Sequence, residues 1–142
     1  MDEKIASSLL ELICKVTENH DLIAALVYGS RVAGYARKDS LYDCMAICEY
    51  PGGTRYHHEL LNCTGVDILE IDNELFLLDI RKGALGEFVS GRLLFPYIGL
   101  VGMAYLDENE ITLKERVVGK VMKRRGSKNK KTRGVKNKNL LR

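Results

Sequence analysis

The spacing of apolar residues changes from helical to strand-like within the first 30 residues. Over residues 2–19 they recur every three or four positions, which predicts an amphipathic helix packed on a sheet. The residues of this stripe are Ile5, Leu9, Ile13 and Val16. Residues 22–28 are nearly all apolar and predict a central strand.

Two further strands are expected. Because side chains alternate along a strand, Asp43, Met45 and Ile47 should share one face, with Cys44, Ala46 and Cys48 on the other. Residues 65–71 predict a third strand after a turn at 51–54, and residues 55–63 form a polar connection that is either a helical turn or an edge strand.

The second half of the chain has weaker patterns. Asn73 can cap a helix that begins at Glu74 and continues, broken at two glycines, to about residue 89. The apolar stretch Leu93 to Leu106 has no clear period, and we favour a cover for the core over a dimer patch. Asp107 and Glu110 have the spacing of a capping box before a final helix to about Arg125.

Charge divides the chain. Of its 22 Lys and Arg residues, 11 lie in residues 120–142, which contain no acid, so residues 1–119 hold all 19 acids. We therefore expect one domain over 1–125 and a disordered basic tail over 126–142 that binds RNA or DNA. Its candidate contact residues are Lys123, Arg124, Arg125, Lys128, Lys130, Lys131, Arg133, Lys136 and Lys138.

Cysteine usage and the termini indicate a cytoplasmic protein. The four cysteines show no Cys-x-x-Cys pair, so we interpret them as reduced core or half-buried thiols rather than metal ligands. The N-terminus opens acidic with no apolar signal core, and the apolar stretch 93–106 is too short to span a bilayer, which predicts no membrane association.

The junction of the first two strands carries the candidate chemistry. Gly29 and Ser30 follow the first strand, and a glycine allows a sharp turn whose following amides attract anions. A short helix is expected from about Ser30 to Ala36. Asp43 opens the second strand, where a charged group is unusual. Either it binds a ligand or it bonds loop amides.

This stretch resembles the nucleotidyltransferase superfamily that includes DNA polymerase beta and the small prokaryotic nucleotidyltransferases. The matching features are an apolar strand, Gly29-Ser30-Arg31, Gly34, and Asp43 at the second position of an Asp-x-Asp motif, over residues 20 to 72. Leu41 replaces the first aspartate of the motif, and Asp67 fits the later carboxylate. The resemblance implies an α/β (α+β) fold with a mixed sheet flanked by helices.

The resemblance also implies roles for residues. Gly29 and Ser30 would grip the phosphates of a nucleoside triphosphate, Arg31 would neutralise charge, and Asp43 and Asp67 would be the catalytic carboxylates that bind Mg²⁺ or Mn²⁺. With Leu41 in the chain, the metal ions lose an anionic oxygen. Arg37 and Lys38 lie in the next loop, either within reach of a triphosphate or simply solvated.

Other polar residues are given structural interpretations. Asp39 is expected in a turn, Glu70 and Asp72 as solvent-facing acids at a strand end, and the histidines on the surface. The histidines are His20, His57 and His58.

Three hypotheses for function follow. The first is transfer of a nucleoside monophosphate from a nucleoside triphosphate to a hydroxyl on RNA, protein or a small molecule. The second is an inactive module of the same fold that binds nucleic acid through the tail. The third resembles the small nucleotidyltransferases paired with a helical toxin, with a protein partner or a second copy docked on the tail or on residues 93–106.

Overall fold

A computed structural model describes residues 1–18, 21–49 and 52–131 of the chain. The elements, in order, are α1 (Glu3–Thr17), β1 (Asp21–Tyr28), α2 (Ser30–Ala33), β2 (Tyr42–Glu49), β3 (Thr54–Leu61), β4 (Thr64–Asp72), α3 (Asn73–Lys82), the 3₁₀ helix η1 (Ser90–Leu94), β5 (Tyr97–Val101) and α4 (Met103–Lys131). The α/β class expected from the sequence is confirmed, with a mixed sheet and flanking helices.

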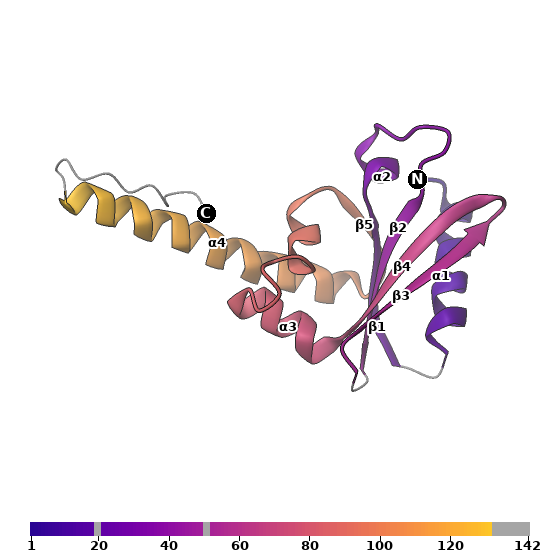
Figure 1. The fold of residues 1–142 in the computed structure, drawn as a ribbon, viewed down its shortest axis with the longest axis horizontal. Helices are drawn as coiled ribbons and strands as arrows, with labels where there is room; N and C mark the ends of the chain where they lie inside the picture. Colours follow the sequence, from indigo (N-terminus) through magenta and orange to yellow (C-terminus); the bar gives the residue numbers. More distant parts are fainter. Residues whose placement is uncertain (19–20, 50–51, 132–142) are drawn as a thin grey trace.

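The sheet has the strand order β3-β4-β2-β1-β5. β2 and β4 are parallel, and the other neighbouring pairs are antiparallel. Helix α1 covers one face, while α3, η1 and the first part of α4 cover the other (Figure 1). Of the two alternatives for residues 55–63, the edge strand is correct and the helical turn is not, since β3 pairs with β4 at one end of the order.

The alternation expected for β2 is confirmed, because each of its faces lies in a different core. Met45 and Ile47 pack with Phe76 and Ile80 of α3. Cys44 and Ala46 pack with the α1 stripe that contains Leu9 and Ile13. Burial on both faces explains why β1 and β2 read as nearly continuous apolar runs.

Glycines and caps set helix ends that differ from the sequence prediction. The helix expected from Ser30 to about residue 36 ends at Ala33, because Gly34 adopts a left-handed conformation at its C-cap. Helix α3 is capped by Asp72, whose carboxylate accepts a hydrogen bond from the amide of Glu74 at 3.0 Å, and not by Asn73. Asp72 is thus a cap rather than an idle surface acid.

The predicted continuation of that helix to residue 89 is wrong. Left-handed Gly83 ends α3, and the chain then forms turns up to η1. The carboxylate of Asp79, which is fully buried, accepts hydrogen bonds from the amides of Leu85, Glu87 and Ser90. A buried carboxylate thus replaces helical hydrogen bonding as the organiser of this segment.

Residues 93–106 contain an element that the sequence pattern did not reveal. β5 pairs antiparallel with β1 at the sheet edge, and α4 already begins at Met103. Asp107 therefore lies inside α4 and is not a cap. The stretch does contribute Leu93 and Leu106 to the core, as favoured, while Phe95 remains exposed.

The final helix ends later than the expected position near Arg125. Helix α4 continues to Lys131 and extends away from the sheet (Figure 1), so residues 126–131 are helical rather than disordered. Residues 132–142 of the expected tail lie outside the described residues.

Candidate functional site

A polar row crosses the sheet at the end where α2 lies. The aligned positions on the five strands are Tyr97, Tyr28, Asp43, Asp67 and His58, in the order β5, β1, β2, β4, β3. Residues aligned across strands point to the same face. The next row on that face contains the core residues Leu26, Met45 and Leu69, so the polar row borders the apolar core.

The row brings the two predicted carboxylates together. Asp43 of β2 is the register partner of Asp67 of β4, and neighbouring strands lie about 4.8 Å apart. Burial and then the negative charge of Asp67 raise the pKa of Asp43, while the positive charge of Arg92 opposes this. Two anions held this close favour a cationic ligand between or beside them.

Gly29 is required by this arrangement for two reasons. Its φ is +88°, a conformation that side chains rarely adopt, and a Cβ at this position would lie 2.6 Å from Oδ2 of Asp43. The backbone of the turn therefore lies directly against the Asp43 carboxylate. Gly29 and Ser30 stand where the sequence placed them, at the junction of β1 and α2.

Asp67 has a partner that the sequence did not suggest. Nδ1 of His58, on edge strand β3, lies 2.7 Å from Oδ1 of Asp67. His57, on the opposite face of β3, places Nε2 2.8 Å from Oε1 of Glu70, which is fully buried. The expectation that Glu70 faces solvent is wrong, because Glu70 is the register partner of Ala46 on the sheet face that packs against α1. The expectation of surface histidines holds for His58, which is exposed, whereas His57 is only partly exposed. His20 lies outside the described residues.

Arg31 does not point a free charge at the site. Its Nε and one terminal nitrogen donate to the carbonyl of Ser40 at 3.0 and 2.7 Å, and its guanidinium lies 4.8 Å from the ring centre of Tyr42. It thus fastens the loop that leads into β2. Arg37 and Lys38 lie exposed in that loop, with the amide of Arg37 bonded to Oγ of Ser40 at 2.7 Å.

Arg92 is the functional candidate that sequence analysis missed. It lies in η1, with its guanidinium 4.9 Å from the ring centre of Tyr28 and 5.2 Å from that of Phe88. Burial is the main reason that the pKa of Tyr28 rises to about 12, and Arg92 counteracts it. No local motif marks Arg92, because its position depends on the irregular segment after α3.

Leu41 directly precedes β2 and stands two residues before Asp43. It is 41% exposed. A Cβ at Gly65 would overlap the Leu41 side chain, so Leu41 lies over Gly65 of β4, two positions before Asp67 on the same face. Within the part of the chain that the structure describes, no group of three or more His, Cys, Asp or Glu side chains could hold a metal ion. The site therefore offers two carboxylates and not three.

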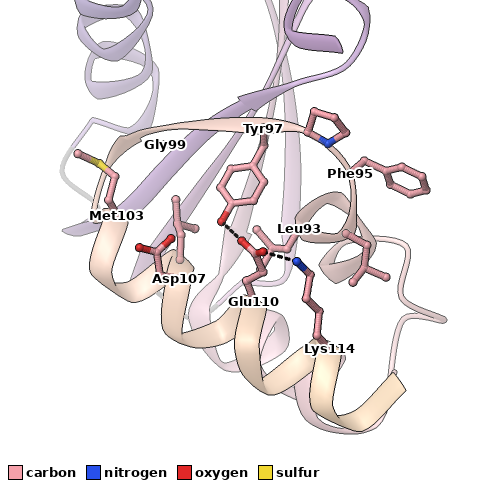
Figure 2. Close-up of a pocket in the computed structure, with 11 residues that line it drawn as sticks. Leu93, Phe95, Tyr97, Gly99, Met103, Asp107, Glu110 and Lys114 are labelled. Atoms are coloured by element: carbon pink, nitrogen blue, oxygen red, sulfur yellow. Dashed lines mark hydrogen bonds and ion pairs between the residues drawn. The ribbon is translucent and has the colours of Figure 1, made fainter. Parts of the chain in front are cut away.

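An open pocket of about 580 Å³ lies between η1, β5 and the start of α4 (Figure 2). Inside it, Glu110 accepts hydrogen bonds from the hydroxyl of Tyr97 at 2.6 Å and from Nζ of Lys114 at 2.5 Å. These bonds, the one from Lys114 foremost, lower the pKa of Glu110. Tyr97, Glu110 and Lys114 thus bind one another, so the carboxylate pair is the stronger candidate site.

Cysteines and basic residues lie away from the carboxylate pair. Cys44 and Cys48 are buried, whereas Cys14 and Cys63 are exposed, so the expectation of core thiols holds for two of the four. Of the candidate nucleic-acid contacts, those up to residue 131 fall on the last part of α4, and Arg133, Lys136 and Lys138 lie outside the described residues.

No protein-family model matches the sequence, and no match is found among curated proteins. In the described part of the chain, no helix combines the length and apolar character needed to cross a membrane.

Proposed function

We propose that the chain is a nucleotidyltransferase-like protein that binds a nucleoside triphosphate and transfers its nucleoside monophosphate to a hydroxyl acceptor, with pyrophosphate as the leaving group. The observation that carries this proposal is the pairing of Asp43 with Asp67 directly beside the Gly29 turn. Fold likeness alone would not support an activity, whereas adjacent carboxylates at a backbone turn supply specific chemistry.

The donor set fits one magnesium ion better than two. Magnesium is commonly held by one or two carboxylates together with substrate phosphates, and Asp43 and Asp67 supply two. The raised pKa of Asp43 reflects burial and the neighbouring anion, so a bound cation would relieve the repulsion. Such an ion would neutralise charge on the phosphates during transfer. Leu41 offers no oxygen for a second ion.

The chain's own residues would position the reactants. The turn at Gly29 would place backbone amides next to Asp43, since no side chain separates the turn from that carboxylate. His58 would hold Asp67 in place through its 2.7 Å hydrogen bond. Arg31 would fix the loop before β2 and hence the direction in which Asp43 points.

Label transfer from each of the four nucleoside triphosphates tests the proposal. Native protein, Asp43→Ala and Leu41→Asp are incubated with Mg²⁺ or Mn²⁺ and with cellular RNA or protein as acceptor. Asp39→Ala is the matched control, since it removes an exposed acid from the nearby loop. We expect native and control activity, loss in Asp43→Ala and a gain in Leu41→Asp. Activity in Leu41→Asp alone, or in no variant, would refute transfer by the native chain.

A second candidate function is nucleic-acid binding through the basic C-terminal segment. Two observations favour it: residues 120–142 carry 11 basic residues and no acid, and α4 extends away from the sheet (Figure 1). Binding through phosphate contacts should weaken steeply as salt rises. Deleting residues 126–142 should remove most RNA binding at 50 mM salt, and salt-insensitive binding would contradict this function.

A further inference from the structure

A smaller pocket of about 350 Å³ adjoins the carboxylate pair. Tyr28 and Gly29 form its inner wall, Arg92 contributes the charged group, and Tyr35 and Phe95 contribute rings. Tyr28 is the register partner of Asp43, and Gly29 lies against the Asp43 carboxylate. A ligand in this pocket would therefore reach the proposed reactive centre.

The guanidinium of Arg92 is held without an anionic partner. It lies between the rings of Tyr28 and Phe88, and its buried Nε has no hydrogen-bond acceptor. Among the described residues, no ion pair joins Arg92 to a carboxylate, Asp43 included. Aromatic faces attract a cation, but they do not replace the hydrogen bonds that a guanidinium loses on burial.

Two other arginines of the chain show which bonds Arg92 lacks. Arg31 is bonded to the carbonyl of Ser40, and Arg116 to the carbonyl of Ile80 and to Glu87. Arg92 differs from both, since its planar fork of donors has no such bonds. Guanidinium groups bind phosphate oxygens in pairs, which makes phosphate the matching anion.

The pocket also has an aromatic surface that fits the base of a nucleotide. Tyr35 and Phe95 are each 71% exposed, so their ring faces are accessible to a ligand in the pocket. Flat rings beside a phosphate-binding cation match the two parts of a nucleotide, because bases stack on aromatic side chains. A volume of about 350 Å³ falls within the usual range for a small-molecule site.

We infer that Arg92 binds the phosphates of the nucleoside triphosphate, with the base against Tyr35 and Phe95, and that this binding needs no divalent cation. The inference rests on the proposed function, since it places the substrate at the same site. Arg92 supplies positive charge at a centre where Leu41 removes a metal ligand. Nucleotide binding and metal-dependent transfer thereby become separable.

Fluorescence anisotropy of a fluorophore-labelled ATP, titrated with the full chain in EDTA and then in Mg²⁺, tests this inference. Arg92→Gln removes the charge, and Arg92→Lys retains it without the planar fork. Lys82→Gln, at the exposed end of α3, is the matched control. In EDTA we expect Arg92→Gln to weaken binding about tenfold or more, Arg92→Lys to weaken it less, and the control to match the native chain.

Tyr35→Ala separates base from phosphate and avoids any effect on the core, because this side chain is largely exposed. It should weaken binding of the labelled ATP about fivefold or more but leave competition by inorganic triphosphate unchanged, whereas Arg92→Gln should weaken both. Native binding seen only with Mg²⁺, or equal binding by native, Arg92→Gln and Tyr35→Ala proteins, would overturn the inference. Metal-free binding lost in Arg92→Gln would support it even if label transfer is silent, so the two proposals fail independently.

Discussion

The buried carboxylate of Asp79 should be one of the strongest single contributors to stability. Its Oδ1 accepts hydrogen bonds from the amides of Leu85 and Glu87 at 2.7 and 3.1 Å, and its Oδ2 accepts one from Ser90 at 2.7 Å. Replacing it by asparagine keeps the shape but turns one oxygen into an amino group. If the remaining oxygen serves Leu85 and Glu87, the amino group faces the buried amide of Ser90.

The expected loss follows from these contacts. One charge-assisted hydrogen bond, worth about 1.5–3 kcal/mol, disappears, and a buried donor is left unsatisfied at a cost of about 1–3 kcal/mol. The substitution also removes a negative charge from the C-terminal end of α3, where the helix dipole disfavours anions, and this offsets a few tenths of a kcal/mol of the loss. We expect Asp79→Asn to lower the free energy of unfolding by about 3 kcal/mol, and the Tm by about 10 °C.

The pH dependence gives a second test. Burial alone would raise the pKa of Asp79, but hydrogen bonds from Ser90, Leu85 and Glu87 outweigh it and hold the pKa below its ordinary value of 3.8. Folding thus favours the charged form, and this stabilisation is present above about pH 4. It is lost as the pH falls through the lowered pKa, so the difference between native protein and Asp79→Asn should shrink on acidification.

Urea unfolding followed by circular dichroism at pH 7, 5 and 3 measures both effects. Asp72→Asn is the matched control, because it makes the same change at the other end of α3, where asparagine still caps the helix. The control should change the free energy of unfolding by less than about 0.5 kcal/mol. Equal losses in the two variants, or a loss in Asp79→Asn that does not depend on pH, would refute the reasoning.

Three further substitutions test the site and its surroundings. Gly29→Ala should cost about 1–3 kcal/mol in urea unfolding, because of its positive φ and the 2.6 Å approach to Asp43, and an unchanged midpoint would contradict this geometry. Asp43→Asn should stabilise the protein by a few tenths of a kcal/mol at pH 7, because the raised pKa means that ionisation of Asp43 opposes folding. This gain should vanish near pH 4 in thermal unfolding, and a larger gain in acid would reverse the assigned sign. Tyr97→Phe should lose about 1 kcal/mol with its hydrogen bond to Glu110, and equal stability would show that bond to be immaterial.

Strong local patterns allowed the first half of the fold to be predicted. Helix α1 and strands β1, β2 and β4 have long, regular apolar patterns, and the alternation along β2 correctly assigned Asp43 to one face. Strand β5 was missed because five half-buried residues next to Pro96 carry no alternation of their own. Its pairing with β1 depends on a contact that is distant in sequence.

The candidate site divides in the same way. Periodicity assigned Asp43 to one face of its strand, whereas the expectation that Asp67 lies nearby came from the resemblance to nucleotidyltransferases. The hydrogen bond of His58 with Asp67 depends on β3 lying beside β4. The sequence did not reveal this pairing, because residues 55–63 could be either a helical turn or an edge strand. Arg92 could not be found from spacing, since Asp79 fixes the preceding turns through bonds to residues 6 to 11 positions away.

The strand order has a consequence for the time at which the site is completed during synthesis. Residues up to 72 contain β1 to β4 and both carboxylates, whereas Arg92 and β5 follow later in the chain. At roughly 5–20 residues per second, the ribosome synthesises Arg92 and β5 one to several seconds after β4. A nascent chain stalled before residue 90 would thus carry a facing pair of anions with no cation beside them.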